Sequence, residues 1–242
     1  IVRLSRELKI DIAIDLKGFT LNSKTKLFAY RLAPIQINFL GYPGSLGANF
    51  IDYIIADETL IPENERKYYS EKIIYLPNSY QPNDNQRIIS QIETKKKDFN
   101  FPEDSLILSC LNSSYKITPE ELEIWCSILK KTKNTYLWLL DTNKKGKNNL
   151  INFFNNKNIN IERIKFAENI PHSRHLERLK HSDIFLDTFN VNAHTTCSDA
   201  LWAGVPVVTK QGKQFSARVA SSLLKALNLN ELITTNKAEY EK

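Results

Sequence analysis

The chain has 242 residues, of which 42% are hydrophobic and 25% are charged. These proportions are those of a globular protein, and no apolar run approaches the ~20 residues that a membrane span needs. The net charge of +6 gathers in short lysine runs without interleaved aromatic residues. That pattern is typical of solvated loops, so the sequence favours neither a membrane nor a nucleic-acid partner.

Three cysteines, Cys110, Cys126 and Cys197, are too few and too widely spaced for a disulfide framework. They indicate a reducing compartment, and we expect a cytoplasmic protein. The sequence contains no methionine, opens within a helical pattern at Ile1 and stops within a charged run at Lys242. We therefore expect a fragment of a longer protein.

The first region contains four short apolar runs rich in β-branched residues, at 12–16, 35–40, 53–56 and 73–76. Such runs predict buried strands. Residues 24–32 carry apolar side chains at helical spacing and end just before Pro34, which predicts a helix. Residues 77–104 are polar and contain three prolines. We expect one domain over residues 1–80, a linker over 81–104 and a second domain over 105–242.

The second region alternates regularly between the two kinds of pattern. Strands are predicted at 106–111, 136–140, 164–167, 184–187 and 205–209, and helices at 119–130, 148–156, 173–180, 196–202 and 216–227. Five consecutive βα units predict an α/β fold with a parallel sheet and helices on both faces. We expect a nearly complete Rossmann-like domain.

Several standard chemical motifs are absent. The sequence has no GxGxxG, no GxxxxGK[ST], no GxSxG and no D-x-D pair, which favours a metal-free chemistry. All four histidines lie between residues 172 and 194. A zinc site of His172, His175, His194 and Cys197 is one interpretation, but no CxxC or HExxH pair supports it.

The turn 190–196 between a strand and a helix is the strongest candidate site. A helix N-terminus presents unpaired N–H groups and the positive end of the helix dipole, to which the hydroxyls of Thr195 and Thr196 add donors. At the carboxyl end of a parallel strand, this arrangement suits a diphosphate. Plain N-capping by a threonine is the alternative. Asp199, one turn further on, is either an acceptor for ribose hydroxyls or a solvated carboxylate.

Two neighbouring elements supply further candidates. His175 and Arg178 lie three residues apart on one predicted helix, so they could stack on a base and meet an anionic group. Lys116 follows the strand 106–111 and could neutralise a phosphate. A solvated lysine in a polar turn is the alternative.

Several segments occur together in a recognisable order. They are LGYPG at 40–44, DYIIAD at 52–57, YKI at 115–117, LDT at 186–188, HTT at 194–196 and DALWAGVP at 199–206. In this order they resemble the catalytic region of protein O-linked N-acetylglucosamine transferases and their SPINDLY relatives.

The resemblance implies a GT-B fold of two Rossmann-like parallel-sheet domains, the first of them incomplete here. It implies an inverting, metal-independent transfer of a sugar, GlcNAc from UDP-GlcNAc, to serine and threonine hydroxyls of proteins. The partners would be a nucleotide-sugar donor and an acceptor protein, with no cofactor. Tetratricopeptide repeats, the acceptor surface and the general base would lie outside this sequence.

The resemblance also implies roles for individual residues. Lys116 would stabilise the leaving phosphate and Asn112 would contact the donor. His175 and Arg178 would flank the base, Asp199 would bind the ribose, and the diphosphate would be held by His194, Thr195 and Thr196. Gly41, Pro43 and Gly44 would border the donor from the first domain.

Two positions depart from the family pattern. Ser113 replaces a glutamine and His172 replaces a lysine of the animal members. Both changes concern donor contacts, so two alternatives stay open. The enzyme could use another donor, such as GDP-fucose, or the chain could be a non-catalytic module that binds nucleotide sugars.

Overall fold

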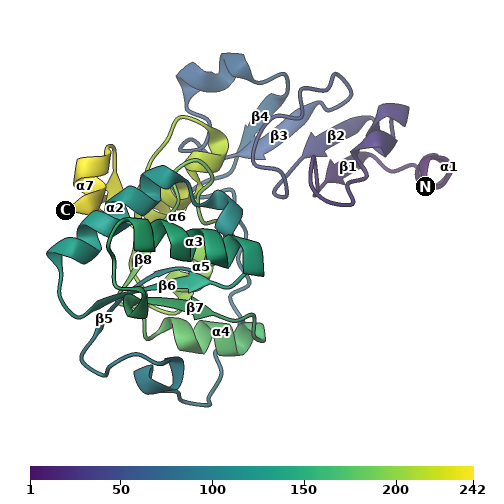
Figure 1. Cartoon of the computed structure of the whole chain (residues 1–242). Helices are drawn as coiled ribbons and strands as arrows, with labels where there is room; N and C mark the ends of the chain where they lie inside the picture. Colours follow the sequence, from purple (N-terminus) through teal and green to yellow (C-terminus); the bar gives the residue numbers. More distant parts are fainter. The chain divides into compact units, whose positions relative to one another are not determined.

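The computed structural model describes all 242 residues (Figure 1). The chain divides into two compact units, residues 1–82 with 214–218 and residues 83–213 with 219–242. None of its helices combines the length and the apolar character that a membrane span requires.

The first unit is built on a parallel sheet of four strands in the order β1-β2-β3-β4. Its elements are α1 (Val2–Glu7), β1 (Ile12–Asp15), η1 (Thr25–Tyr30), β2 (Ile35–Asn38), β3 (Tyr53–Ala56), η2 (Glu63–Tyr68) and β4 (Lys72–Tyr75), with η6 (Phe215–Ala217) joining from later in the chain. All four strands lie close to their predicted positions. The prediction that they are buried is wrong for the edge strand β1, where Ile12 is 50% and Ile14 45% exposed, whereas β2 inside the sheet is mostly buried.

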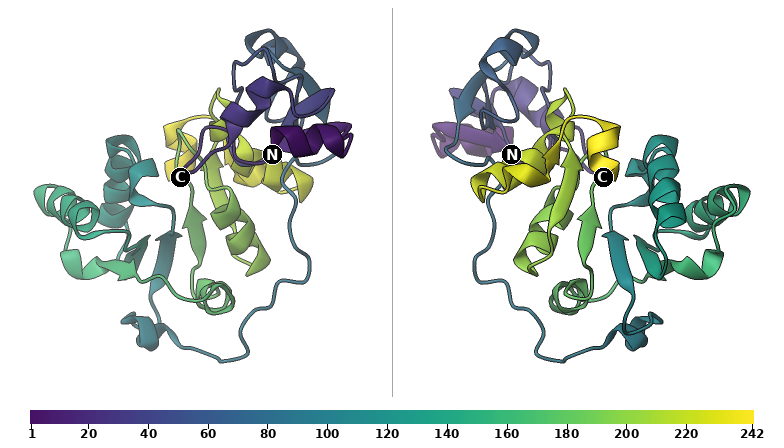
Figure 2. Two further views of the ribbon diagram at one scale, coloured as in Figure 1. Left: turned by 90° about the vertical axis from the view of Figure 1, so that its right-hand side faces the viewer. Right: turned by 90° about the vertical axis from the view of Figure 1, so that its left-hand side faces the viewer.

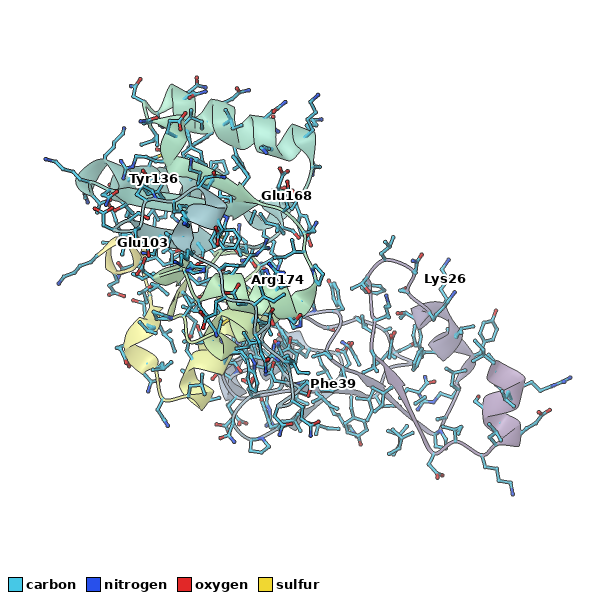
Figure 3. All side chains as sticks on the ribbon, turned by 90° about the horizontal axis from the view of Figure 1, so that it is seen from below. Lys26, Phe39, Glu103, Tyr136, Glu168 and Arg174 are labelled. Carbon is cyan, nitrogen blue, oxygen red and sulfur yellow. The ribbon has the colours of Figure 1, made fainter.

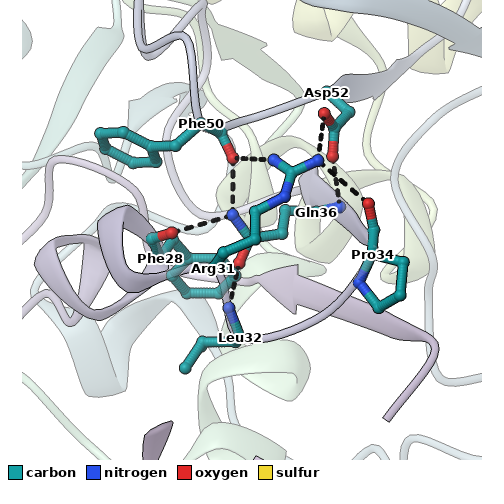
Figure 4. Close-up of polar contacts among 7 residues, drawn as sticks. All are labelled: Phe28, Arg31, Leu32, Pro34, Gln36, Phe50 and Asp52. Carbon is teal, nitrogen blue, oxygen red and sulfur yellow. Dashed lines mark hydrogen bonds and ion pairs between the residues drawn. The ribbon is translucent and has the colours of Figure 1, made fainter. Parts of the chain in front are cut away.

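A helix is present in the predicted segment 24–32, but it is the 3-10 helix η1 and not an α-helix. The side chain of Gln36 explains the difference (Figure 4). Its Nε2 donates to the carbonyl of Phe28 at 2.9 Å, and its Oε1 accepts from the backbone N–H of Leu32 at 2.8 Å. Arg31 adopts a left-handed φ of 56° between them. A buried glutamine from the next strand therefore takes the backbone groups that an α-helix would have used.

Arg31 and Asp52 hold the end of the loop between β2 and β3 that leads into β3 (Figure 4). Nη2 of Arg31 donates to Oδ1 of Asp52 at 2.8 Å, and Nη1 donates to the carbonyl of Phe50 at 3.0 Å. Burial opposes ionisation of Asp52, but the hydrogen bonds from Arg31 and from the N–H of Gln36 outweigh it and lower the pKa of Asp52. This pair therefore fixes the last residues of the loop that contains Gly41, Pro43 and Gly44.

The second unit is built on a six-stranded parallel sheet in the order β10-β9-β8-β5-β6-β7. The strands are β5 (Leu106–Cys110), β6 (Thr135–Leu140), β7 (Ile164–Ala167), β8 (Ile184–Leu186), β9 (Val207–Lys210) and β10 (Ile233–Thr234). The helices are η3 (Lys96–Phe99), η4 (Ser114–Lys116), α2 (Pro119–Lys131), α3 (Lys144–Asn156), η5 (Ile161–Arg163), α4 (His172–Leu179), α5 (Thr195–Trp202), α6 (Val219–Ala226), η7 (Asn230–Leu232) and α7 (Lys237–Glu241). The predicted α/β class with a parallel sheet is confirmed.

Helices cover both faces of this sheet, with α2 and α3 on one face and α4 on the other (Figure 1). Trp125 of α2 and Phe154 of α3 are fully buried, as are Leu137 and Leu139 of β6 in the same apolar cluster. The helix α2 begins at a capping box, in which Glu121 accepts from the backbone N–H of Thr118 at 2.9 Å. The apolar layers fix the strands, so the loops at the carboxyl edge of the sheet have a rigid base.

Residues 83–104, expected to be part of a linker, belong to the second unit. In Figure 2 they are the blue extended stretch that leads to η3. The N–H of Ser90 donates to the carbonyl of Ser173 at 3.0 Å. Thr94 donates through its N–H and its hydroxyl to the buried carboxylate of Glu177 on α4. This segment is polar in composition as a linker would be, but specific hydrogen bonds hold it against α4.

Candidate functional site

The sheet of the second unit has a switch point between β5 and β8. The chain proceeds from β5 outward through β6 and β7, and then returns to β8 and proceeds the other way. Ligands of open parallel sheets bind beyond the carboxyl ends of the strands at such a point. Nδ2 of Asn112, just after β5, donates to Oγ1 of Thr188, just after β8, at 2.9 Å. The hydroxyl of Thr196 donates to Oδ1 of Asn112 at 2.5 Å, so Asn112 joins both strands to α5.

The buried carboxylate of Asp187 fixes the turn that leads from β8 to α5. Its Oδ1 accepts from the backbone N–H groups of Thr188 at 2.8 Å and of Ala193 at 2.5 Å, which closes the turn at both ends. Its Oδ2 accepts from the hydroxyl of Thr209 on β9 at 2.6 Å. Burial raises the pKa of Asp187 to about 7, and the three hydrogen bonds act in the opposite direction.

A second buried carboxylate, that of Glu121, holds the same turn from α2. Its Oε1 accepts from the backbone N–H of Phe189 at 2.7 Å, while its Oε2 completes the capping box. Both carboxylates are shielded from solvent, since Glu121 and Asp187 are each 0% exposed. The backbone between β8 and α5 is therefore determined by side chains from α2 as well as from the turn itself.

Lys116 lies at the end of η4 and reaches this turn with its ammonium group. Nζ donates to the carbonyl of Asn192 at 2.9 Å. Burial lowers the pKa of Lys116, and the nearby Asp187 raises it. The interpretation of Lys116 as a solvated lysine is wrong, because the ammonium is held at the carboxyl edge of the sheet, beside the switch point.

The N-terminus of α5 projects beyond this turn. His194 is its N-cap residue, and no side chain caps the helix. The interpretation of Thr195 and Thr196 as N-caps is therefore wrong. Thr195 is exposed, whereas His194 and Thr196 are half-buried. The first-turn N–H groups of a helix, together with its dipole, favour an anion at this position.

His175 and Arg178 meet each other on α4, as their spacing predicted. Nε and Nη2 of Arg178 lie 3.2 and 2.9 Å from Nδ1 of His175. Because the guanidinium only donates, Nδ1 is the acceptor and the imidazole is neutral with its proton on Nε2. Burial and the charge of Arg178 lower the pKa of His175 to about 4.

Arg178 is itself buried, at 3% exposed, so it lies behind the imidazole. Its Nη1 donates at 2.6 Å to the carbonyl of Glu168, the residue that follows β7. In Figure 3, the label of Glu168 marks the residue after β7, and the label of Arg174 marks helix α4. Arg178 fixes the plane and the protonation of His175, and the carbonyl of Glu168 anchors the guanidinium.

Asp199 is buried on α5 and is already paired. Its Oδ1 accepts from Nη1 of Arg87 at 2.7 Å and lies 3.1 Å from Nε2 of His172. The interpretation of Asp199 as a solvated carboxylate is therefore wrong. Its partner Arg87 lies in the segment 81–104, which was expected to be a linker.

Gly41, Pro43 and Gly44 lie in the first unit, in the loop that follows β2. A Cβ on Gly41 would approach the carbonyl oxygen of Leu16 to 2.2 Å, so this glycine is required for packing within the unit. A Cβ on Gly44 would meet only the ring of Tyr42, at 3.5 Å.

The zinc hypothesis receives no support from the geometry. The structure contains no group of three or more histidine, cysteine, aspartate and glutamate side chains placed to hold a metal ion. His172 instead contacts Asp199, and Cys197 is a buried free thiol.

Three residues of this region were not identified from the sequence. Asp187 lies inside the LDT segment and Glu121 inside a capping-box pattern, so both had a local signal that could have marked them. Arg87 had none, because its partner Asp199 is 112 residues away in the sequence.

These features place the protein among the Rossmann-like α/β proteins, with a polar site at the switch point of the parallel sheet. The chain belongs to glycosyl transferase family 41, whose sequence model matches residues 5–96 and 88–242.

Two plant relatives illustrate the similarity. The chain is 37% identical to an Arabidopsis thaliana protein described as a probable UDP-N-acetylglucosamine–peptide N-acetylglucosaminyltransferase SEC, over 100% of this chain and 25% of the relative. It is 30% identical to a Petunia hybrida SPINDLY protein with the same description of activity, over 97% of this chain and 25% of the relative. The chain thus spans about a quarter of the length of these relatives.

Solved structures show the same fold. An O-GlcNAc transferase mutant from Thermobaculum terrenum superposes with a TM-score of 0.89 at 28% identity, over 99% of this chain and 45% of that one. Anabaena HepE in complex with UDP and glucose superposes with a TM-score of 0.57 at 10% identity, over 95% of this chain and 77% of that one, which shows the fold alone. The predicted GT-B type of fold is confirmed.

Proposed function

We propose that this chain is the donor-binding part of a glycosyltransferase that moves GlcNAc from UDP-GlcNAc to serine and threonine hydroxyls of proteins. Family membership and the similarity to the Arabidopsis and Thermobaculum proteins support this proposal. The three cysteines are buried free thiols, which fits a reducing compartment such as the cytoplasm.

The observation that carries the proposal is the position of Lys116 beside the N-terminus of α5. Its ammonium is fixed 2.9 Å from the carbonyl of Asn192, in the turn that starts α5. A diphosphate gains negative charge as it leaves the anomeric carbon of the sugar. A half-buried ammonium and the helix dipole, both preorganised, stabilise such charge without a metal ion. In an inverting reaction, the acceptor hydroxyl attacks the anomeric carbon from the face opposite this leaving group.

The remaining residues have consistent roles in this proposal. His175 presents a neutral N–H from Nε2, which suits a carbonyl oxygen of a base or a phosphate oxygen. Asp199 has a carboxylate oxygen available for ribose hydroxyls. Thr195 adds an exposed hydroxyl at the N-terminus of α5, whereas Asn112 and Thr196 bond each other and hold the wall of the site.

The experiment is Lys116→Ala in the complete protein, with UDP-GlcNAc and an acceptor protein. We expect kcat to fall by ~10²-fold or more, the usual cost of losing one charge-stabilising donor. Lys130→Ala removes an exposed lysine of α2 and serves as the matched control. Near-normal turnover by Lys116→Ala would contradict the proposal.

The same assay separates the alternatives. Competition by UDP but not GDP supports a uridine donor, and the reverse result supports a GDP-fucose donor. Activity that survives a chelator supports the metal-free reaction. Donor binding without turnover by the complete wild-type protein would indicate a non-catalytic module.

A further inference from the structure

The segment 83–94 contributes a side chain to the site although it belongs to none of the βα units. Nη1 of Arg87 donates to Oδ1 of Asp199 at 2.7 Å, and the two side chains are only 12% and 6% exposed. The pair is therefore largely desolvated. Removing one partner of a buried ion pair leaves an uncompensated charge. The remaining side chain then moves towards solvent, or the folded protein is destabilised.

Arg87 is held independently of Asp199. Its Nε donates to the carbonyl of Asp84 at 3.1 Å, its guanidinium lies 4.9 Å from the ring centroid of Trp202, and its carbonyl accepts from Nε1 of Trp202 at 3.3 Å. Further along, Thr94 is tied to the buried Glu177. These contacts hold Arg87 in place beside Asp199, so that its guanidinium does not depend on that carboxylate alone for its position.

Arg87 and His172 occupy the same oxygen of Asp199. His172 Nε2 lies 3.1 Å from Oδ1, and Oδ2 accepts no hydrogen bond. An ionised carboxylate only accepts, and ribose hydroxyls donate. With Oδ1 occupied, the side chain is held in one orientation and Oδ2 is left for a ligand.

We propose that Arg87 is a positioning residue that fixes Asp199, so that its Oδ2 accepts from the ribose hydroxyls of the nucleotide donor. This inference rests on the proposed function, because it assumes a nucleotide at the switch point. Arg87 acts through Asp199 and does not touch the phosphates. His172 supports the same orientation from the N-terminus of α4.

The test measures equilibrium binding of UDP and of 2′,3′-dideoxy-UDP to the complete protein. Arg87→Gln should weaken UDP about tenfold, the order of one hydrogen bond to a charged group. It should change binding of the dideoxy analogue by less than about twofold, because that analogue has no ribose hydroxyls to lose. A merely structural role of Arg87 would weaken both ligands equally.

Two further variants complete the test. The double variant Arg87→Gln/Asp199→Asn should bind UDP no more weakly than Asp199→Asn alone, since Arg87 acts through that carboxylate. Arg3→Gln, which removes an arginine whose side chain is 92% exposed in the first unit, is the matched control. If Arg87→Gln does not fold, Arg87→Lys keeps the charge with altered geometry and should show a smaller but still ribose-dependent loss.

The outcomes distinguish the role of Arg87 from the proposed function. Unchanged UDP affinity in Arg87→Gln, equal losses for both ligands, or additive effects in the double variant would overturn the role of Arg87 and leave the proposed function standing. Absence of UDP binding by the wild-type protein, with no binding of GDP either, would overturn the proposed function and with it this inference.

Discussion

The neutral state of His175 should make the stability of the protein depend on pH in a defined way. Arg178 donates to Nδ1 through Nε and Nη2, at 3.2 and 2.9 Å. A proton on Nδ1 would displace both hydrogen bonds and place a second cation against the guanidinium. The folded protein therefore resists a protonation that the unfolded chain accepts readily.

The size of the effect follows from the pKa values. The pKa of His175 falls from 6.5 to about 4 on folding, and each unit is worth ~1.4 kcal/mol. The stability that His175 contributes is present above the unfolded pKa and is lost as the pH falls through it. At about pH 5 the loss amounts to ~2 kcal/mol, and its limit at lower pH is ~3 kcal/mol.

The assay compares urea unfolding of wild type and His175→Asn between about pH 4.5 and about pH 7.5. Asparagine places its Oδ1 close to the position of Nδ1, so the variant keeps an acceptor for Arg178 and loses the titration. The wild-type advantage over the variant should shrink by ~2 kcal/mol from neutral pH to about pH 5. Parallel stability curves for the two proteins would refute the assignment of His175 as a buried neutral acceptor.

Two further outcomes are expected. Asp187→Asn should show a pH dependence of the opposite sign. Burial raises the pKa of Asp187 to about 7, so the folded protein keeps a proton that the unfolded chain releases. The stability of wild type relative to this variant should therefore decline as the pH rises from about 4 to about 7, and an increase over this window would contradict the prediction. Gly41→Ala should lower the free energy of unfolding by ~1–3 kcal/mol, because its Cβ would meet the carbonyl of Leu16 at 2.2 Å. Gly44→Ala, with its nearest neighbour at 3.5 Å, should change it by less than about 0.5 kcal/mol, and equal effects of the two substitutions in thermal or urea unfolding would exclude this explanation.

The opposite signs at His175 and Asp187 have a practical consequence. Both groups act in overlapping pH ranges, so their contributions partly cancel in the wild-type protein. A nearly flat wild-type profile would therefore not show that both groups are unperturbed. The difference between wild type and each variant isolates one titration at a time.

The periodic elements could be predicted from the sequence because their signals are local. The apolar runs at β5, β6 and β7 and the capping box at Thr118 each lie within a few residues. The resemblance placed Lys116 and Asp199 in the site, and the structure brings both to the carboxyl edge of the sheet.

The rest depended on contacts between distant parts of the chain. The 3-10 form of η1 results from Gln36, which belongs to the next strand. The pairing of Arg87 with Asp199 joins a polar segment, whose composition gives no signal, to a helix that lies 112 residues away in the sequence. The short helix α7 lies in the charged run at the end of the sequence, yet Tyr240 is buried and its hydroxyl donates to the carbonyl of Asp187 at 2.9 Å.

The strand order of the second unit also determines when the site can form. The pairs β5–β6 and β6–β7 join consecutive segments, so that half of the sheet has a low contact order and can assemble early. The bond between Asn112 and Thr188 spans 76 residues and closes only when β8 returns to β5. The ligand site is thus the junction of two folding halves.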